Sequence, residues 1–185
     1  EIVSIGLNDS FADIAPTPYH YTDEAYIESI SAPRRDKFSH KGDYGHTLLV
    51  CGSKGMAGAA FLATGAALRS GCGYVTVALP DSYTAALAAV YPSALTIGQE
   101  ADFFCHIPDR LDRYTSIAIG CGLGRRPELA TPVERLFEAY RKPMVVDADA
   151  INLLAEYPAL QRLLPKGSIL TPHDGELARL VGRWT

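Results

Sequence analysis

From His46 onward, uninterrupted apolar runs alternate with segments of helical periodicity. HTLLVCG (46–52) and YVTVALP (74–80) are typical of strands buried on both faces of a parallel sheet. Between them, 56–69 consists mostly of small residues and is predicted to be a helix that packs close to the sheet. Further strands are predicted at 93–98, 115–120, 143–150 and 168–172. Further helices are predicted at 81–90, 129–140, 150–155, 159–163 and 174–181, with 102–113 as connecting structure.

Repeated alternation of strands and helices with short connections indicates an α/β fold, in which a mostly parallel sheet carries helices on both faces. The pattern does not fix the order of the strands. The first 45 residues differ, because they contain many turn-forming residues and little periodicity. They predict a strand at 2–5, a linker with two prolines near Tyr19, and a short helix at 23–31.

Size and charge narrow the function classes. At 185 residues and 48% hydrophobic, the chain is expected to be globular with one full core. Its net charge of −4 is spread along the sequence, and no basic cluster could neutralise a run of phosphates, so no nucleic-acid partner is expected. No apolar run approaches the roughly 18 residues that span a bilayer. No signal peptide opens the chain, and no membrane association is expected.

The four cysteines, at 51, 72, 105 and 121, form no CxxC pair, so neither a zinc site nor another metal centre is expected. Cys51 and Cys72 lie in or beside apolar segments, where a free thiol behaves as a small hydrophobic residue. This pattern predicts a reduced, cytoplasmic protein.

Four polar or glycine-rich loops follow predicted strands. In parallel α/β sheets the ligand site lies beyond the carboxyl ends of the strands, so these loops are expected to meet at one edge. They comprise residues 52–58, 120–124, 147–152 and 173–176.

The first loop, GSKGMAG, could present backbone N–H groups to an anion at the start of the following helix, with Lys54 adding charge. Alternatively, its glycines only permit a tight turn and close contact between helix and sheet. It is not a Walker A loop, because no GK[ST] follows at the required spacing.

The second loop, GCGLG (120–124), suggests a Rossmann fingerprint but fails it. The third glycine of that pattern would fall at 125, which is Arg125, and Asp147 lies 27 residues beyond Gly120 rather than about 20. The glycines Gly120, Gly122 and Gly124 still suggest close approach of a ligand.

The third and fourth loops carry the candidate polar side chains. Asp149 could cap the next helix, whereas Asp147, at the strand end, could orient a substrate hydroxyl or a metal-bound water. In TPHDGELAR (171–179), Thr171 or Asp174 could cap the helix, and His173 is expected to contact a ligand. No serine or cysteine nucleophile pairs with His173, so a hydrolase triad is not supported.

Taken together, these loops resemble a known family. The runs KGDYGHTLLVCGSKGMAGAAFLATGAALRSGCGYVTV (41–77), AIGCGLG, VVDADAINLLA and ILTPHDGELARLVG are similar to the ADP/ATP-dependent NAD(P)H-hydrate dehydratases. These belong to the carbohydrate-kinase-like branch of the ribokinase-like fold, a three-layer α/β/α architecture. The resemblance covers about residues 35–182.

The resemblance implies a repair reaction in which hydrated NADH or NADPH is dehydrated at the expense of ADP or ATP, with Mg²⁺. The nucleotide would phosphorylate the ring hydroxyl, so that phosphate leaves more readily than hydroxide. By motif, the contacts to the hydrated cofactor would be Ala59, Gly122, His173, Asp174, Gly175, Glu176 and Arg179. Supporting positions would be Lys41, Gly58, Gly120, Gly124, Asp147 and Asn152.

One departure from the family concerns the C-terminal part. The resemblance implies about a hundred further residues, with a GTGD segment whose aspartate is the expected catalytic base. That aspartate would lie beyond residue 185, so no catalytic residue is assigned here, and we expect weak or no turnover from these 185 residues alone. At the other end, 1–34 resemble the linker or tail of an NAD(P)HX epimerase domain, and 35–185 would be the N-terminal portion of the dehydratase domain.

Three alternatives stay open. They are a small-molecule kinase of the same fold, a non-catalytic dinucleotide-binding fragment, and a Rossmann oxidoreductase, which the failed fingerprint disfavours. Association of the chain with further copies is also expected, because uncovered sheet edges and apolar surface favour it.

Overall fold

The computed structural model describes residues 16, 18, 21–30 and 35–182, and the chain divides into two compact units, residues 1–38 and 39–185. In the first unit, the predicted short helix is confirmed as α2 (Glu24–Ile30), none of whose residues is buried. The strand expected at 2–5 lies outside the described residues.

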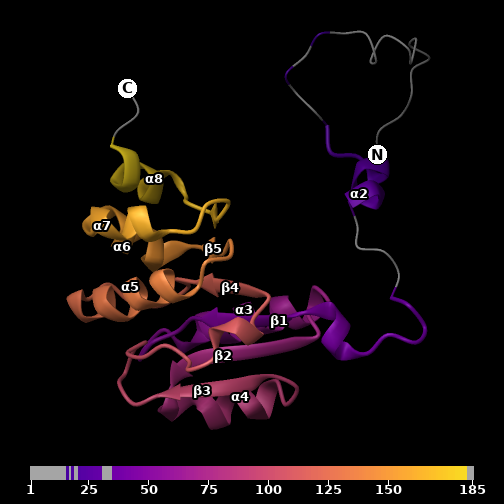
Figure 1. Cartoon of the computed structure of the whole chain (residues 1–185), viewed down its shortest axis with the longest axis horizontal. Coiled ribbons are helices and arrows are strands. Elements are labelled where there is room, and N and C mark those ends of the chain that lie inside the picture. The colour runs from indigo at the N-terminus through magenta and orange to yellow at the C-terminus, as the bar shows by residue number, and fades with distance from the viewer. Residues whose placement is uncertain (1–15, 17, 19–20, 31–34, 183–185) are drawn as a thin grey trace. The chain divides into compact units, whose positions relative to one another are not determined.

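The second unit is built on a six-stranded parallel sheet, which confirms the predicted fold class (Figure 1). Its strands run in the spatial order β3-β2-β1-β4-β5-β6. The central register pairs Val50 of β1 with Ala78 of β2 on one side and Ile119 of β4 on the other. The strands are β1 (His46–Val50), β2 (Tyr74–Pro80), β3 (Leu95–Gln99), β4 (Ser116–Ile119), β5 (Val145–Val146) and β6 (Ile169–Leu170).

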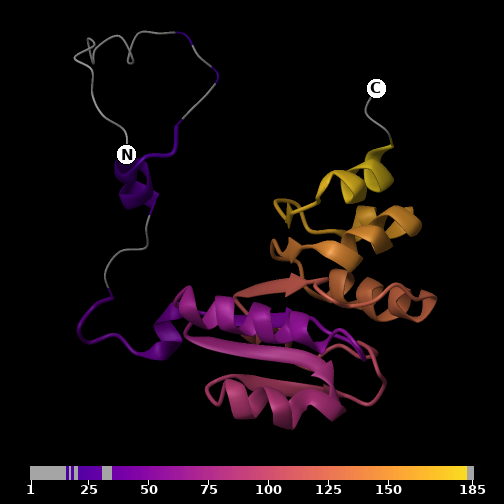
Figure 2. The same ribbon diagram turned by 180° about the vertical axis from the view of Figure 1, so that it is seen from behind.

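Helices cover both faces of this sheet, because successive side chains of a strand point to opposite sides. Leu49 and Cys51 pack with α3 (Ala57–Arg69) and α4 (Thr84–Val90). Leu48 and Val50 belong to the larger core cluster, formed with α5 (Ala130–Ala139), α6 (Ala148–Glu156) and α7 (Pro158–Leu163). Figure 2 shows α3 and α4 together on one side of the strands.

The sequence predicted the closing helix α8 (Asp174–Val181) with its observed bounds. Four single turns of 3-10 helix complete the unit. They are η1 (Lys41–Tyr44), η2 (Asp81–Tyr83), η3 (Leu111–Arg113) and η4 (Pro127–Leu129). Within the described part of the chain, no helix is long and apolar enough to cross a membrane.

The strand predicted at 143–150 is wrong in its second half. β5 ends at Val146, and α6 begins at Ala148, so the DADA run starts a helix instead of ending a strand. The backbone turns at Ala148, whose φ of 46° lies in the left-handed region, at a cost of about 1–2 kcal/mol for a residue with a Cβ. The helix-forming residues that follow, INLLA, continue the turn as α6.

A polar network lies at the amino end of β1. His46 Nε2 is 2.7 Å from Thr76 Oγ1, and the His46 ring meets the ring of buried Tyr114 edge-on at 4.8 Å. Partial burial, and secondarily the positive charge of Arg113, lower the pKa of His46 from its usual value. His46 is therefore neutral at neutral pH, which suits the hydrogen bond with Thr76.

This shift predicts an acid-side loss of stability. Because the folded pKa of His46 is lowered, the unfolded chain binds more protons than the folded one, and the His46 contribution is lost as pH falls below about 6.5. We expect His46→Asn, which cannot titrate, to flatten the dependence of unfolding free energy on pH between neutrality and pH 5. Denaturant unfolding at several pH values measures this, with His106→Asn at the surface as the control. An unchanged slope in His46→Asn would contradict it.

Candidate functional site

The four predicted loops leave four neighbouring strands, β1, β4, β5 and β6, at the carboxyl edge of the sheet. The chain winds outward from β1 to β3 and then returns to β4 on the other side of β1. Such a reversal of strand order is where ligands of doubly wound sheets bind. The first two loops, after β1 and β4, lie on either side of this reversal.

These two loops are in direct contact. Ser53 Oγ donates to the Gly122 carbonyl at 3.0 Å, and the Gly52 amide donates to the Cys121 carbonyl at 2.9 Å. A Cβ on Gly122 would lie 2.7 Å from the Ala59 Cβ and 2.8 Å from a backbone carbonyl, and its φ is 63°. The structure therefore brings together Ala59 and Gly122, two of the predicted contacts.

The glycines of the first loop serve different purposes. Gly52 has a φ of 82° and lies against Ala60, so it fits the tight-turn interpretation. Gly58 lies in the first turn of α3 in an ordinary helical conformation, and a Cβ there would meet no atom within 4 Å. Neither packing nor backbone geometry requires glycine at 58, and the space beside it is open. Lys54 forms an exposed ion pair with Asp102 at 2.9 Å.

Asp149 holds the second loop. Its Oδ2 accepts from the Gly124 amide at 2.9 Å, so the interpretation of Asp149 as the cap of α6 is wrong. The side chain instead spans from the first turn of α6 to the loop after β4. Arg125, at the position where a Rossmann fingerprint would place glycine, pairs with Glu156 of α6.

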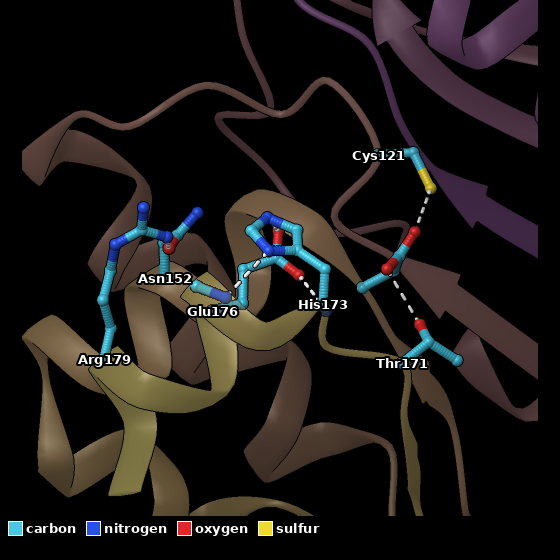
Figure 3. A network of polar contacts seen from close by, with 8 residues as sticks. Cys121, Asn152, Thr171, His173, Glu176 and Arg179 are labelled. Atoms are coloured by element: carbon cyan, nitrogen blue, oxygen red, sulfur yellow. Dashed lines mark hydrogen bonds and ion pairs between the residues drawn. The ribbon is translucent and has the colours of Figure 1, made fainter. Parts of the chain in front are cut away.

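Asp147 connects the second loop with the fourth (Figure 3). Its Oδ1 accepts from Thr171 Oγ1 at 2.8 Å, and its Oδ2 accepts from the Cys121 thiol at 3.2 Å. Thr171 therefore contacts Asp147 instead of capping α8. Sequence reasoning missed Cys121 and Thr171 as partners of Asp147, although Cys121 lies next to the selected Gly120 and Thr171 had been considered as a helix cap.

His173 caps α8 through its ring. Nδ1 accepts from the Gly175 amide at 3.0 Å, so in the neutral ring the proton is on Nε2, which faces Glu176 Oε1 at 3.2 Å. Glu176 Oε2 in turn accepts from the His173 amide at 3.1 Å, and this carboxylate is 8% exposed. The imidazole is 68% exposed and is thus accessible to a ligand.

Asn152 and Arg179 extend this group. Arg179 Nη1 donates to Oδ1 of Asn152, which is buried in α6, at 2.8 Å. A Cβ on Gly175 would lie 3.0 Å from the His173 ring and 3.9 Å from Arg179 Nη2, so both side chains lie over this glycine. Figure 3 shows Asn152, Glu176, His173 and Arg179 gathered at the start of α8. Asp174, also predicted, occupies the first position of the helix.

The predicted residues thus form two groups, Ala59 with Gly122 and the His173 group. Among the described residues no hydrogen bond or ion pair joins the two groups directly, and Asp147 connects their loops through Cys121 and Thr171.

Lys41 lies elsewhere, and the expectation that it shapes the same cleft is not supported by its position. It belongs to η1, before β1, and its Nζ lies 4.7 Å from the centre of the Tyr74 ring at the start of β2. The five residues of β1, at about 3.3 Å each, place it roughly 16 Å from the loops. A surface-open cavity of about 340 Å³, lined by Ile97, Arg110 and Tyr114, also involves none of the four loops.

The described residues offer no ready metal site. Within residues 35–182 and the short described stretches before them, no three His, Cys, Asp or Glu side chains are arranged to hold an ion. A Mg²⁺ ion that accompanies a nucleotide is therefore assigned to none of these residues.

Comparison with solved structures identifies the fold. A ribokinase-like superfamily protein from Enterococcus faecalis, 23% identical, superposes with a TM-score of 0.74 over 90% of this chain and 59% of its own, which shows that the fold is shared. The chain belongs to the NAD(P)H-hydrate dehydratase family, whose model matches residues 47–185. The predicted resemblance and the ribokinase-like fold are both confirmed.

Individual relatives agree. The bifunctional NAD(P)H-hydrate repair enzyme of Moorella thermoacetica is 39% identical over 158 residues, 81% of this chain and 30% of the relative. The ADP-dependent (S)-NAD(P)H-hydrate dehydratase of Lactococcus lactis is 37% identical over 162 residues, 87% of this chain and 57% of the relative. A solved Bacillus subtilis ADP/ATP-dependent NAD(P)H-hydrate dehydratase, co-crystallised with ATP and Mg²⁺, is 32% identical with a TM-score of 0.69, covering 86% of this chain and 55% of its own. The chain thus spans between about a third and slightly over half of these relatives.

Proposed function

We propose that the protein restores NADH or NADPH from the hydrated cofactor at the expense of ADP or ATP, and that the loops described here bind the hydrated dinucleotide. The convergence of four loops at one sheet edge, all within the stretch matched by the dehydratase family, carries this proposal. The names of the relatives, which include an ADP-dependent dehydratase, support the reaction.

The chemistry proposed for the whole protein is an elimination assisted by phosphorylation. Transfer of a phosphoryl group to the ring hydroxyl creates a better leaving group than hydroxide, and loss of phosphate restores the dihydronicotinamide. ADP or ATP, bound with Mg²⁺, would supply the phosphoryl group. The catalytic base is proposed to lie outside residues 1–185, because none of these residues is assigned to proton transfer.

In this proposal the described residues bind and orient the substrate. The Ala59 amide already donates to the Met56 carbonyl, so the start of α3 is proposed to receive the pyrophosphate group through the amides of Ala57 and Gly58, beside the open space at Gly58. The exposed His173 ring and the exposed Arg179 guanidinium, both at α8, are proposed to contact the rest of the dinucleotide, with His173 Nε2 shared between the ligand and Glu176. Residues 1–34 are proposed to be the linker or tail of a preceding epimerase-like domain, and the name of one relative, a bifunctional repair enzyme, is consistent with a second activity in such a protein.

Isothermal titration of the 185-residue chain with NADPH, hydrated NADPH and ATP tests this assignment. The proposal expects the hydrated dinucleotide to bind more tightly than ATP. Preference for ATP, or for small alcohols from a kinase substrate panel, would favour a small-molecule kinase of the same fold instead.

A pair of substitutions separates the two roles of His173. His173→Ala removes the cap of α8 and is expected to lower the unfolding free energy by about 1 kcal/mol. His173→Asn keeps an acceptor for the Gly175 amide, so stability should be retained, whereas affinity for the hydrated dinucleotide should fall about two- to tenfold through one lost hydrogen bond. Calorimetric titration and denaturant unfolding measure both, and unchanged affinity in both variants would exclude contact.

A further inference from the structure

Two cysteines meet where the loops after β1 and β4 cross. Cys51 follows the strand-end residue Val50 directly, Cys121 lies two residues beyond its partner Ile119, and both side chains pack in the same apolar cluster. The Gly52 amide donates to the Cys121 carbonyl at 2.9 Å, which fixes the two backbones side by side. Neighbouring strands lie about 4.8 Å apart. Cys121 lies one residue beyond Gly120, which is level with Cys51, and a rise of about 3.3 Å per residue makes the diagonal between the two cysteines about 5.8 Å. This separation lies within the range of about 4.4–6.8 Å between Cα atoms that a disulfide bridges.

The two thiols differ in access. Cys51 is 1% exposed, within the core cluster that includes Leu49 and Ala60. Cys121 is half-buried, and its thiol donates to Asp147 Oδ2 at 3.2 Å. A small oxidant can therefore reach Cys121 from the solvent, whereas Cys51 is buried and inaccessible to it.

We propose that Cys121 is a site of oxidative modification by small hydroperoxides, and that Cys51 resolves the oxidised form as a Cys51–Cys121 disulfide. The Cys121 sulfur attacks the peroxide, its O–O bond breaks, and sulfenic acid forms with release of water or an alcohol. The Cys51 sulfur then attacks the Cys121 sulfur, the S–O bond breaks, and a second molecule of water leaves. Together the two thiols give two electrons and two protons to the peroxide.

The ionisation of the pair favours this order of events. The interaction with the neighbouring Cys51 thiol lowers the pKa of Cys121, and this outweighs the opposing effects of burial and of the Asp147 carboxylate. The same interaction and complete burial raise the pKa of Cys51. Because the thiolate is the nucleophile, Cys121 is the thiol that reacts first with a peroxide.

The other two cysteines provide internal comparisons, since all four lie within the described residues. Cys72 is 3.2 Å from Thr47 Oγ1, and Cys105 is 3.6 Å from His106 Nδ1. Both are half-buried, as Cys121 is, yet neither has a thiol partner. Because Cys105 is also half-buried but has no resolving cysteine, it is the control for Cys121.

Oxidation of the reduced 185-residue chain with stoichiometric hydrogen peroxide tests the proposal without any cofactor. Peptide mapping under non-reducing conditions should show one dominant crosslink, Cys51–Cys121, with a mass loss of two hydrogens that a thiol reductant reverses. Cys121→Ser should abolish the crosslink and Cys105→Ser should leave it unchanged. In Cys51→Ser, a dimedone adduct should accumulate on Cys121.

Crosslinks that involve Cys72 or Cys105, or oxidation of Cys121 no faster than of Cys105, would overturn the proposal. The wild-type map and Cys121→Ser decide the question even if substitution of buried Cys51 prevents folding. Because the readout is a covalent bond, failure here is independent of whether the loops bind a hydrated dinucleotide.

Discussion

Gly120→Ala is expected to lower the unfolding free energy by roughly 3 kcal/mol or more. We expect no other single added methyl group at the carboxyl edge of the sheet to have a larger effect. The added Cβ would lie 1.8 Å from the Asp147 carbonyl oxygen, which belongs to the backbone and cannot swing aside. The φ of 129° adds strain for any residue with a Cβ. Against a typical stability of about 5–15 kcal/mol, this loss is between about a fifth and three fifths of the whole.

Substitutions at two other glycines separate the cost of backbone strain from the cost of a steric clash. Gly55 has a φ of 84° but open space, so Gly55→Ala should show only the backbone cost of about 1–2 kcal/mol. Gly58 has neither a positive φ nor a close neighbour for an added Cβ, so Gly58→Ala should not lower the unfolding free energy. In guanidinium unfolding, the loss of stability should be largest for Gly120→Ala, smaller for Gly55→Ala and absent for Gly58→Ala. Equal losses at 55 and 120 would show that the β4 and β5 loops can separate at low cost.

Gly58→Ala is expected to weaken ligand binding while it stabilises the fold. Replacement of a helical glycine by alanine adds about 0.5–1 kcal/mol of stability where space permits. If the dinucleotide lies against α3 as proposed, the new methyl group meets it instead, and an overpacking cost of about 1–3 kcal/mol corresponds to a loss of affinity of roughly five- to 150-fold. Titration with hydrated NADPH and thermal unfolding of the same preparation measure both effects.

Ala66→Ser is the matched control, because residue 66 is exposed on α3 three turns from its start. It should leave affinity unchanged. A more stable Gly58→Ala variant with undiminished affinity would remove the first turn of α3 from the binding surface and would favour a site confined to α6 and α8.

Apolar patterning predicted the core strands because strands such as β1 and β2 are buried on both faces, and burial is what an uninterrupted apolar run records. It misplaced the end of β5 because that strand is only two residues long, and the left-handed turn at Ala148 has no composition signal of its own. The order of the strands was also beyond reach, since pairing of β1 with β4 depends on contacts across 69 residues.

Loop composition located the candidate site but not its internal connections. Gly122 lies in one of the selected loops, Ala59 was selected through the family resemblance, and the two do meet. The part played by Asp147 was hidden, because its partners Cys121 and Thr171 lie 26 and 24 residues away and neither is chemically unusual by itself. Lys41 was selected through the family motif, although it precedes β1 and therefore lies at the end of that strand opposite to the four loops.

The bond between Ser53 and Gly122, which spans 69 residues, has a consequence for the order in which the molecule assembles. Closing so long a loop costs conformational entropy, which slows folding. The contacts that offset this cost form only when both β1 and β4 are in place. This edge of the sheet is therefore expected to form late in folding. In native-state hydrogen exchange, the amides of Gly52 and Gly124 should exchange through the same cooperative opening.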